Sequence, residues 1–221
     1  MKCLIFSAQS AYARFRKPYT TTSALSFSTI HPIAVKGLIG AIMGVEYEEL
    51  HKYTKDMQIA IQVINPIYKD MQSFNLIAQS NNNRAANFQS RVEFLRDVKY
   101  RMFVIDKEEK LEEIKARLED HEYIFTPYLG CSEHIAKLVY EDYVEVEKSS
   151  EKYSDTIVPI EILDIDSVED DTIYMDRIPT NNNQDRVYTE YMQIAFSNKR
   201  QRVTELTQKL YKVGDYNVIF L

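Results

Sequence analysis

The order of its local sequence patterns constrains the fold of this chain more than any other feature. Four β-prone runs alternate with two segments of helical character. The β-prone runs are residues 2–8, 57–67, 92–105 and 138–147, and the helical segments are residues 32–44 and 107–118. The order β-α-β-β-α-β predicts an α+β fold with the ferredoxin-like arrangement, which RNA-recognition modules share. We expect this domain to span residues 1–148.

The first helical segment has clear ends and an unusual interior. Pro32 suits the first turn of a helix, and Gly44 suits its end. Gly37 and Gly40 lie between them, where each glycine costs about 1 kcal/mol relative to alanine. The two glycines therefore indicate that another backbone, a strand or a ligand approaches this helix closely. In the second helical segment Asp106 is the expected cap, and Leu111, Ile114 and Leu118 share one face.

A polar segment, residues 70–91, separates the second and third β-prone runs and contains almost no acids. It predicts a long loop or a hairpin that projects from the fold. Its amide, guanidinium and aromatic groups could wedge between nucleic-acid bases or hold a backbone, although a plain surface loop is an open alternative. The candidate residues are Asn82, Asn83, Arg84, Phe88 and Arg91.

The C-terminal part, residues 149–221, begins with an acid-rich run over residues 149–176. Short β-prone stretches follow, and they predict a small, mainly-β lobe. The carboxylates lack EF-hand spacing, the histidines lack zinc-site spacing, and phosphate-binding glycine motifs are absent. No metal and no cofactor is therefore expected. Two distant cysteines and the lack of a long apolar run favour a cytoplasmic protein without membrane contact.

Charge is divided unevenly along the chain. The formal net charge is −6, which by itself argues against nucleic-acid binding. Residues 1–105 hold 13 basic and 7 acidic side chains, a net of +6, whereas residues 106–221 hold 14 and 26, a net of −12. Residues 1–45 contain no acid at all. This asymmetry suggests that the two parts of the chain face different partners.

The densest polar segment follows the first β-prone run. It combines cations and hydroxyls, which bind phosphate oxygens, with aromatic rings that can stack on bases. Lys36 could add a cation near the N-terminus of the following helix. Two interpretations of this segment stay open. It binds RNA or another phosphate ligand, or it is only a solvated loop. The candidate residues are Arg14, Arg16, Lys17, Tyr19, Thr20, Thr21, Thr22, Ser23 and Lys36.

Catalysis receives little support from the sequence. Tyr19, His31 and Lys36 could be imagined as acid–base groups for attack by an RNA 2′-hydroxyl, but a lone histidine is more often a capping or packing residue. Cys131 and His134 are three residues apart and lack the other parts of a thiol protease. From the residues alone, catalysis is the less favoured of two open interpretations.

Several blocks of the chain resemble the CRISPR-associated Cas-five family, within the RAMP superfamily. The blocks are Tyr12–Ser23, Pro32 with Lys36–Gly44, Arg91–Arg101 and Thr126–Glu133. Together they cover parts of residues 1–136 and look closest to type I-B members.

The resemblance implies a subunit of a Cascade surveillance complex in antiviral defence. In this family a ferredoxin-like domain holds the 5′ handle of the CRISPR RNA (crRNA), and a thumb hairpin, here residues 70–95, packs over the RNA. The implied partners are the crRNA, a Cas-seven-type backbone subunit and a Cas-eight-type large subunit, with target DNA reached through the complex. The candidate residues 14, 16, 17, 19–23 and 36 would bind the handle. In type I-B systems a separate Cas-six enzyme cuts the precursor crRNA, so the resemblance implies no catalytic residue in this chain. One branch, type I-C, cuts the precursor itself, so a metal-independent endoribonuclease is the alternative function.

Overall fold

Strand β1 (Lys2–Ala13) lies at the centre of the main sheet. It pairs antiparallel with β5 (Asn87–Ile105) on one side and with β6 (Lys137–Lys148) on the other. On the far side of β5, β3 (Gln58–Val63) adds a further antiparallel strand, so the core order is β6-β1-β5-β3. The computed structural model describes residues 1–20, 23–77, 87–164, 172–204 and 209–221. The predicted α+β class is confirmed.

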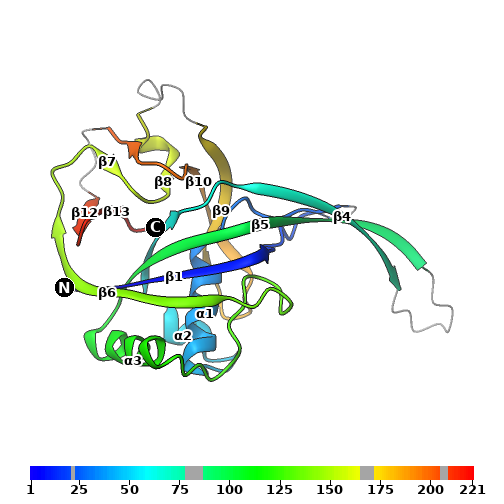
Figure 1. Cartoon of the computed structure of the whole chain (residues 1–221), viewed down its shortest axis with the longest axis horizontal. Coiled ribbons are helices and arrows are strands. Elements are labelled where there is room, and N and C mark those ends of the chain that lie inside the picture. Colours follow the sequence, from blue (N-terminus) through cyan, green and yellow to red (C-terminus); the bar gives the residue numbers. More distant parts are fainter. Residues whose placement is uncertain (21–22, 78–86, 165–171, 205–208) are drawn as a thin grey trace.

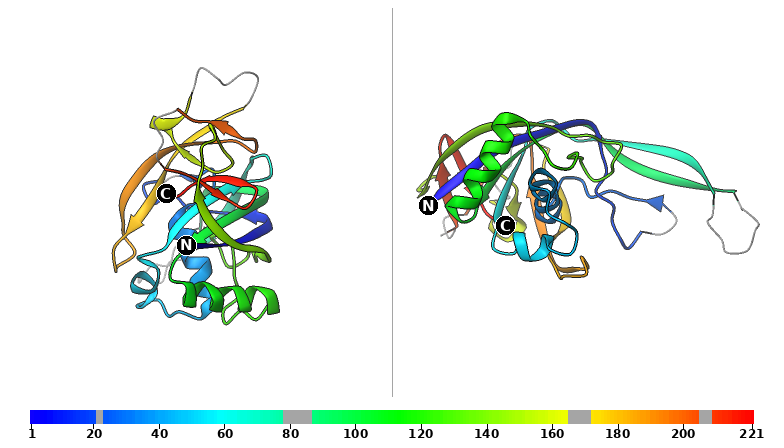
Figure 2. Two further views of the ribbon diagram at one scale, coloured as in Figure 1. Left: turned by 90° about the vertical axis from the view of Figure 1, so that its left-hand side faces the viewer. Right: turned by 90° about the horizontal axis from the view of Figure 1, so that it is seen from below.

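Three helices cover one face of this sheet: α1 (Pro32–Met43), α2 (Leu50–Thr54) and α3 (Glu108–Asp120) (Figures 1 and 2). The two faces follow from the alternation of side chains along β1. Leu4 and Phe6 belong to the large core shared with α1 and α3, while Cys3 and Ile5 pack with Val213 and Val218 on the opposite face. The sheet is therefore buried on both sides along this strand.

Helix α1 has the predicted ends. His31 is the N-cap and its Nδ1 accepts a hydrogen bond from the Ala34 amide at 3.2 Å, while Gly44 closes the helix at φ +68°. The prediction that Asp106 caps the next helix is wrong. Lys107 occupies the N-cap position without a side-chain cap, and the Asp106 carboxylate instead binds the Lys110 ammonium at 2.6 Å.

A long hairpin projects from the body where the sequence predicts a projecting segment (Figure 1). It consists of β4 (Tyr68–Ile77) and the first half of β5, paired from Tyr68 opposite Arg96 to Ile77 opposite Asn87. The second half of β5 pairs with β1 and β3 in the core. Asp97, at φ +54°, marks the point where β5 passes from the hairpin into the core.

Aromatic rings pack where the hairpin meets the body. Phe94 of β5 contacts Phe74 of β4 at 6.0 Å between ring centroids, and it contacts Tyr12 of β1 at 6.2 Å. The His134 ring joins from the loop before β6, at 5.4 Å from Phe94. This cluster links the base of the hairpin to both the first strand and the loop.

The C-terminal part forms small sheets and also extends the main one. Its elements are β7 (Tyr153–Ser154), β8 (Val158–Pro159), a 3-10 turn at Ile160–Ile162, β9 (Tyr174–Asn182), β10 (Tyr188–Phe196), β11 (Gln201–Arg202), β12 (Leu210–Val213) and β13 (Tyr216–Ile219). One sheet has the order β8-β10-β9, and β11 pairs with β7. Because β12 pairs with β6, the last strands join the main sheet. The domain boundary at residue 148 stays a prediction.

No helix within the described ranges is long and apolar enough to cross a membrane.

An ion pair joins the segment after β1 to the C-terminal part. The Lys17 ammonium lies 2.8 Å from the Asp176 carboxylate of β9, and the two side chains are only 17% and 8% exposed. Asp176 also accepts a hydrogen bond from the Ser28 amide at 2.8 Å. Burial alone would raise the pKa of Asp176, but Lys17 and the amides of Ser28 and Arg177 together hold this pKa below its usual value.

We predict that Asp176→Asn lowers the free energy of unfolding by about 2 kcal/mol at pH 7, because it removes a charge-assisted hydrogen bond and the counter-ion of a largely buried lysine. The folded-state pKa of Asp176 lies below its unfolded value, so the ion pair stabilises above the unfolded pKa and its contribution is lost as the pH falls through the folded pKa. The gap between variant and wild type should therefore shrink below about pH 4 in urea titrations.

Glu49→Gln is the matched control, since it removes an ion pair with Lys52 whose side chains are 63% and 79% exposed. We expect it to change stability by no more than about 0.5 kcal/mol. Equal effects of the two variants at pH 7 would contradict the role given to Asp176.

Candidate nucleic-acid interface

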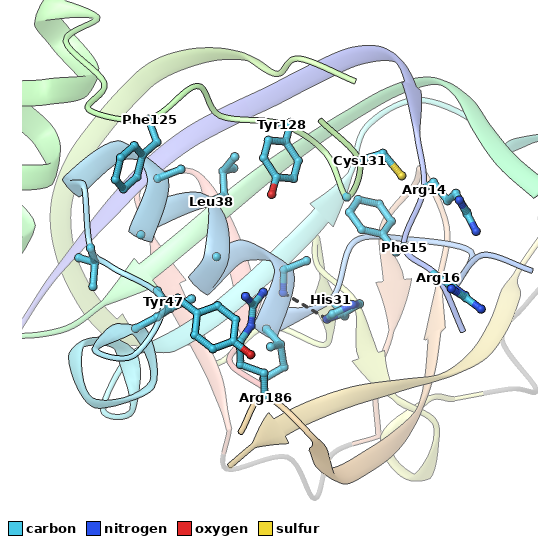
Figure 3. A pocket seen from close by; sticks show the side chains of 18 of the residues that line it. Arg14, Phe15, Arg16, His31, Leu38, Tyr47, Phe125, Tyr128, Cys131 and Arg186 are labelled. Carbon is cyan, nitrogen blue, oxygen red and sulfur yellow. Dashed lines mark hydrogen bonds between the residues drawn. The ribbon is translucent and has the colours of Figure 1, made fainter. Parts of the chain in front are cut away.

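A groove of about 630 Å³ runs along the outer face of α1 (Figure 3). We call it the α1 groove. Its floor is the helix itself, including Gly37 and Leu38, and its sides are residues 125–131 and the segment after α1. The tip of the β9–β10 hairpin adds Arg186 and Tyr188. A groove of this size falls in the ~300–1,000 Å³ range of ligand sites.

One end of the α1 groove is basic. Arg14 and Arg16 follow directly after β1 and both line the groove. The Nε atom of Arg14 is buried and has no hydrogen-bond partner among the described residues. The same guanidinium lies close enough to the Cys131 thiol to act on its pKa. A buried donor without a partner carries a desolvation penalty, which an anion that accepts from this Nε–H would remove.

The loop before β6 holds Arg14 in place. The Arg14 amide donates to the Leu129 carbonyl at 3.1 Å. The next residue, Gly130, adopts φ +87°, and a Cβ atom there would lie 1.9 Å from the Arg14 carbonyl oxygen. Only glycine lets the two backbones approach this closely. The loop and the end of β1 thus fix each other's position at the basic end.

Aromatic rings form the sides of the groove. Tyr128 and Phe125 lie on one side of α1, while Tyr47 lies on the other, beside Arg186 (Figure 3). The Arg186 guanidinium is 4.7 Å from the centre of the Tyr47 ring, a cation–π contact that joins the β9–β10 tip to the segment after α1. Tyr47, Tyr128 and Phe125 are 54%, 46% and 42% exposed. Their rings are therefore available for stacking.

The charge of the lining is positive. Three arginines (14, 16 and 186) face a single carboxylate, that of Glu46. Within the described ranges, none of the three guanidiniums makes an ion pair. This groove therefore joins positive charge with exposed aromatic rings, which is the combination that single-stranded nucleic acids require.

His31 lies beneath the groove as a structural residue. It is 3% exposed, and its ring lies among the rings of Phe15, Phe27 and Tyr188 at centroid distances of 5.4–6.0 Å. Burial lowers its pKa to about 3, so the imidazole is neutral at physiological pH. Its Nδ1 already accepts the hydrogen bond that caps α1.

The structure places the other predicted handle residues in different surroundings. Lys17 is paired with Asp176, and Thr20 Oγ1 donates to the Lys17 carbonyl within a local turn. Tyr19 is 62% exposed outside the groove. Lys36 is buried on another side of α1, where burial lowers its pKa although Asp106 and Asp56 partly oppose this. Their binding of RNA stays a prediction.

Strand β2 (Ser23–Ala24) and the hairpin carry the remaining candidates. Ser23 pairs with Arg91 of β5 in a parallel bridge, and Arg91 is exposed. Phe88 is 48% exposed on the hairpin. The other five candidates lie outside the described residues, namely Thr21, Thr22, Asn82, Asn83 and Arg84.

Sequence reasoning missed most of the groove. Tyr47, Phe125 and Arg186 carry no local signal, because each meets α1 only in the folded chain. Tyr128 lies inside Thr126–Glu133, one of the blocks that resemble the family. The sequence signal at Gly37 is the cost of a glycine within a helix, which indicates close approach of another group. The thiol of Cys131 is no nucleophile candidate, since burial raises its pKa.

Comparison with known proteins identifies the family. The family model described as "CRISPR-associated protein (Cas_Cas5)" matches residues 3–204. The chain belongs to the Cas-five family of CRISPR-associated proteins. No curated protein sequence matches this family member.

Solved structures share the fold of this Cas-five protein at low sequence identity. A chain of a "CRISPR RNA-guided surveillance complex" gives a TM-score of 0.60 at 12% identity, covering 99% of this chain and 91% of the other. A CRISPR protein from Archaeoglobus fulgidus also gives 0.60 at 12% identity, covering 100% and 99%. A chain of the Type III-B Cmr-beta complex bound to cognate target RNA gives 0.50 at 14% identity, covering 91% and 86%.

We predict that His31→Asn removes a pH-dependent loss of stability. The pKa of His31 is near 3 in the folded chain and near 6.5 in the unfolded chain. Between these two pH values the imidazole takes up a proton only in the unfolded chain, which favours unfolding. This histidine therefore contributes a slope of up to about 1.4 kcal/mol per pH unit below pH 6.5. Asparagine keeps the helix cap but does not titrate.

Urea unfolding between pH 7.5 and about pH 5 measures the slope. His121→Asn is the control, because His121 is exposed and its φ of +55° suits asparagine. An unchanged slope in His31→Asn would contradict the prediction, and an equal change in both variants would show that the burial of His31 is not its cause.

Proposed function

We propose that this Cas-five protein is a non-catalytic crRNA-binding subunit of a type I Cascade complex, and that the α1 groove is its site for the 5′ handle. The proposal depends on one observation: Arg14 and Arg16, which form no ion pair among the described residues, lie at the end of a groove with exposed aromatic sides. Similarity to a chain of an RNA-guided surveillance complex supports the same role.

The strand order β6-β1-β5-β3, with helices on one face, supports the ferredoxin-like reading of the core. The β4–β5 hairpin lies between the second and third core strands in the chain, which supports its assignment as the thumb. We infer that it packs over the RNA beside a Cas-seven-type backbone subunit. A type I-B-like subtype belongs to the same proposal.

The acidic second half of the chain fits a face turned away from RNA. Helix α3 carries exposed carboxylates, among them Glu109 and Glu112, and β6 carries Glu145 and Glu147. Repulsion from phosphates leaves this face for protein contacts. We infer that the Cas-eight-type large subunit is among its partners, and that target DNA is reached through the complex.

The absence of catalysis is also part of the proposal. Of the three residues considered for RNA cleavage, His31 lines the groove, but Tyr19 and Lys36 do not. His31 is neutral, buried and engaged in capping α1. A general acid–base pair needs two titratable groups within reach of one 2′-hydroxyl. This geometry favours the scaffold over the endoribonuclease.

Replacing both arginines tests the binding site. We predict that Arg14→Ala with Arg16→Ala weakens binding of repeat-derived 5′ handle RNA by a few kcal/mol, because each charged hydrogen bond contributes about 1.5–3 kcal/mol. Fluorescence anisotropy at constant salt measures the change. Lys148→Ala with Lys212→Ala removes the same charge from exposed positions near the start of β1. Equal losses in both double variants would indicate unspecific attraction and contradict the site.

Cleavage is tested separately. We predict that labelled repeat RNA stays intact after long incubation with the purified protein, with or without EDTA, because His31 is buried and neutral and the described lining of the groove includes neither Tyr19 nor Lys36. Denaturing gels measure the products. Cleavage at one position, lost in His31→Asn or in a Lys36→Ala variant, would favour the endoribonuclease.

A further inference from the structure

Gly37 is a glycine that the protein itself does not require. It lies in the middle of α1, where alanine would form a more stable helix. A Cβ atom built on Gly37 meets no described atom within 4 Å. Neither packing nor backbone conformation therefore explains a glycine at this position.

The other glycines each have a structural reason. A Cβ atom would come 2.4 Å from Leu50 at Gly40 and 2.5 Å from Ile124 at Gly44. Gly130 faces the Arg14 carbonyl, and Gly214 adopts φ +57°. All five glycines of the chain are described, so Gly37 stands apart from the other four.

The space in front of Gly37 is the α1 groove. Its floor here is apolar, with Ala34 and Leu38 on either side of the glycine. Tyr128 stands on one side, and Tyr47 with Arg186 stands on the other (Figure 3). The guanidiniums of Arg14 and Arg16 lie at the end of the groove. The groove therefore offers an apolar helix surface between aromatic side chains, with the positive charge of Arg14 and Arg16 at its end.

We propose that one unpaired base of the handle RNA lies flat against the helix backbone at Gly37, with its phosphate toward Arg14 and Arg16. This inference rests on the proposed function and deepens it. A nucleotide joins a planar ring to an anion, which matches the order of surfaces along the groove. A methyl group at position 37 would hold the ring away from the helix. Glycine thus keeps the floor open at the cost of helix stability.

The test combines a protein change with a change in the RNA. Gly37→Ala should raise the melting temperature by about 2–4 °C, since alanine favours the helix. It should weaken binding of the repeat-derived handle RNA about tenfold, comparable with the loss of one stacked base. A set of handle RNAs, each with one abasic nucleotide, locates the base. At one position in the RNA, the losses of binding free energy from the abasic change and from Gly37→Ala should not add, because both changes remove the same contact.

Arg14→Ala is the matched control. It removes a phosphate contact that an abasic nucleotide keeps, so its effect should add to the abasic change at every position outside the nucleotide held at Gly37. Additive effects of Gly37→Ala at every position, or unchanged affinity, would overturn the base contact while leaving RNA binding intact. If wild-type protein binds no handle RNA, the proposed function fails first. If Gly37→Ala leaves RNA affinity unchanged but weakens assembly with a protein subunit, the groove holds a protein segment instead.

Discussion

The double-sided pairing of β1 is the constraint on which the rest of the structure depends. Its residues from Cys3 to Phe6 are buried on both faces, and β5 and β6 flank it on both edges. Alternation sends Leu4 and Phe6 toward α1 and α3, so this strand positions the helices. Its end delivers Arg14, Phe15 and Arg16 to the α1 groove. The position of the basic end is therefore set by the central strand of the sheet.

Local sequence patterns were sufficient for the core elements and insufficient for the groove. Alternation predicts β3 and β6, and Leu111, Ile114 and Leu118 predict the buried face of α3. In contrast, the sequence around Lys17 predicts a free cation. Its partner Asp176, on β9, is 159 residues away in the chain, so only the folded structure shows the pair. Two-residue strands such as β7 exist only through tertiary pairing. Arg186 reaches the groove for the same reason.

The charge division acquires a more precise meaning in the folded chain. Several cations of the first half are engaged within the protein: Lys2 with Glu108, Lys17 with Asp176, and Arg101 with Glu141. What stays unpaired in the described part of the groove is a set of arginines, whose planar forks suit phosphate oxygens. The total of −6 thus says little about the surface that a ligand meets.

The continuity of β5 has a mechanical consequence for assembly. One strand of 19 residues, about 60 Å if fully extended, belongs to the hairpin at one end and to the buried sheet at the other. The direction of the β4–β5 hairpin at its base is therefore fixed when the core folds, before any partner binds. The base of the hairpin therefore loses little conformational entropy when a partner docks against it.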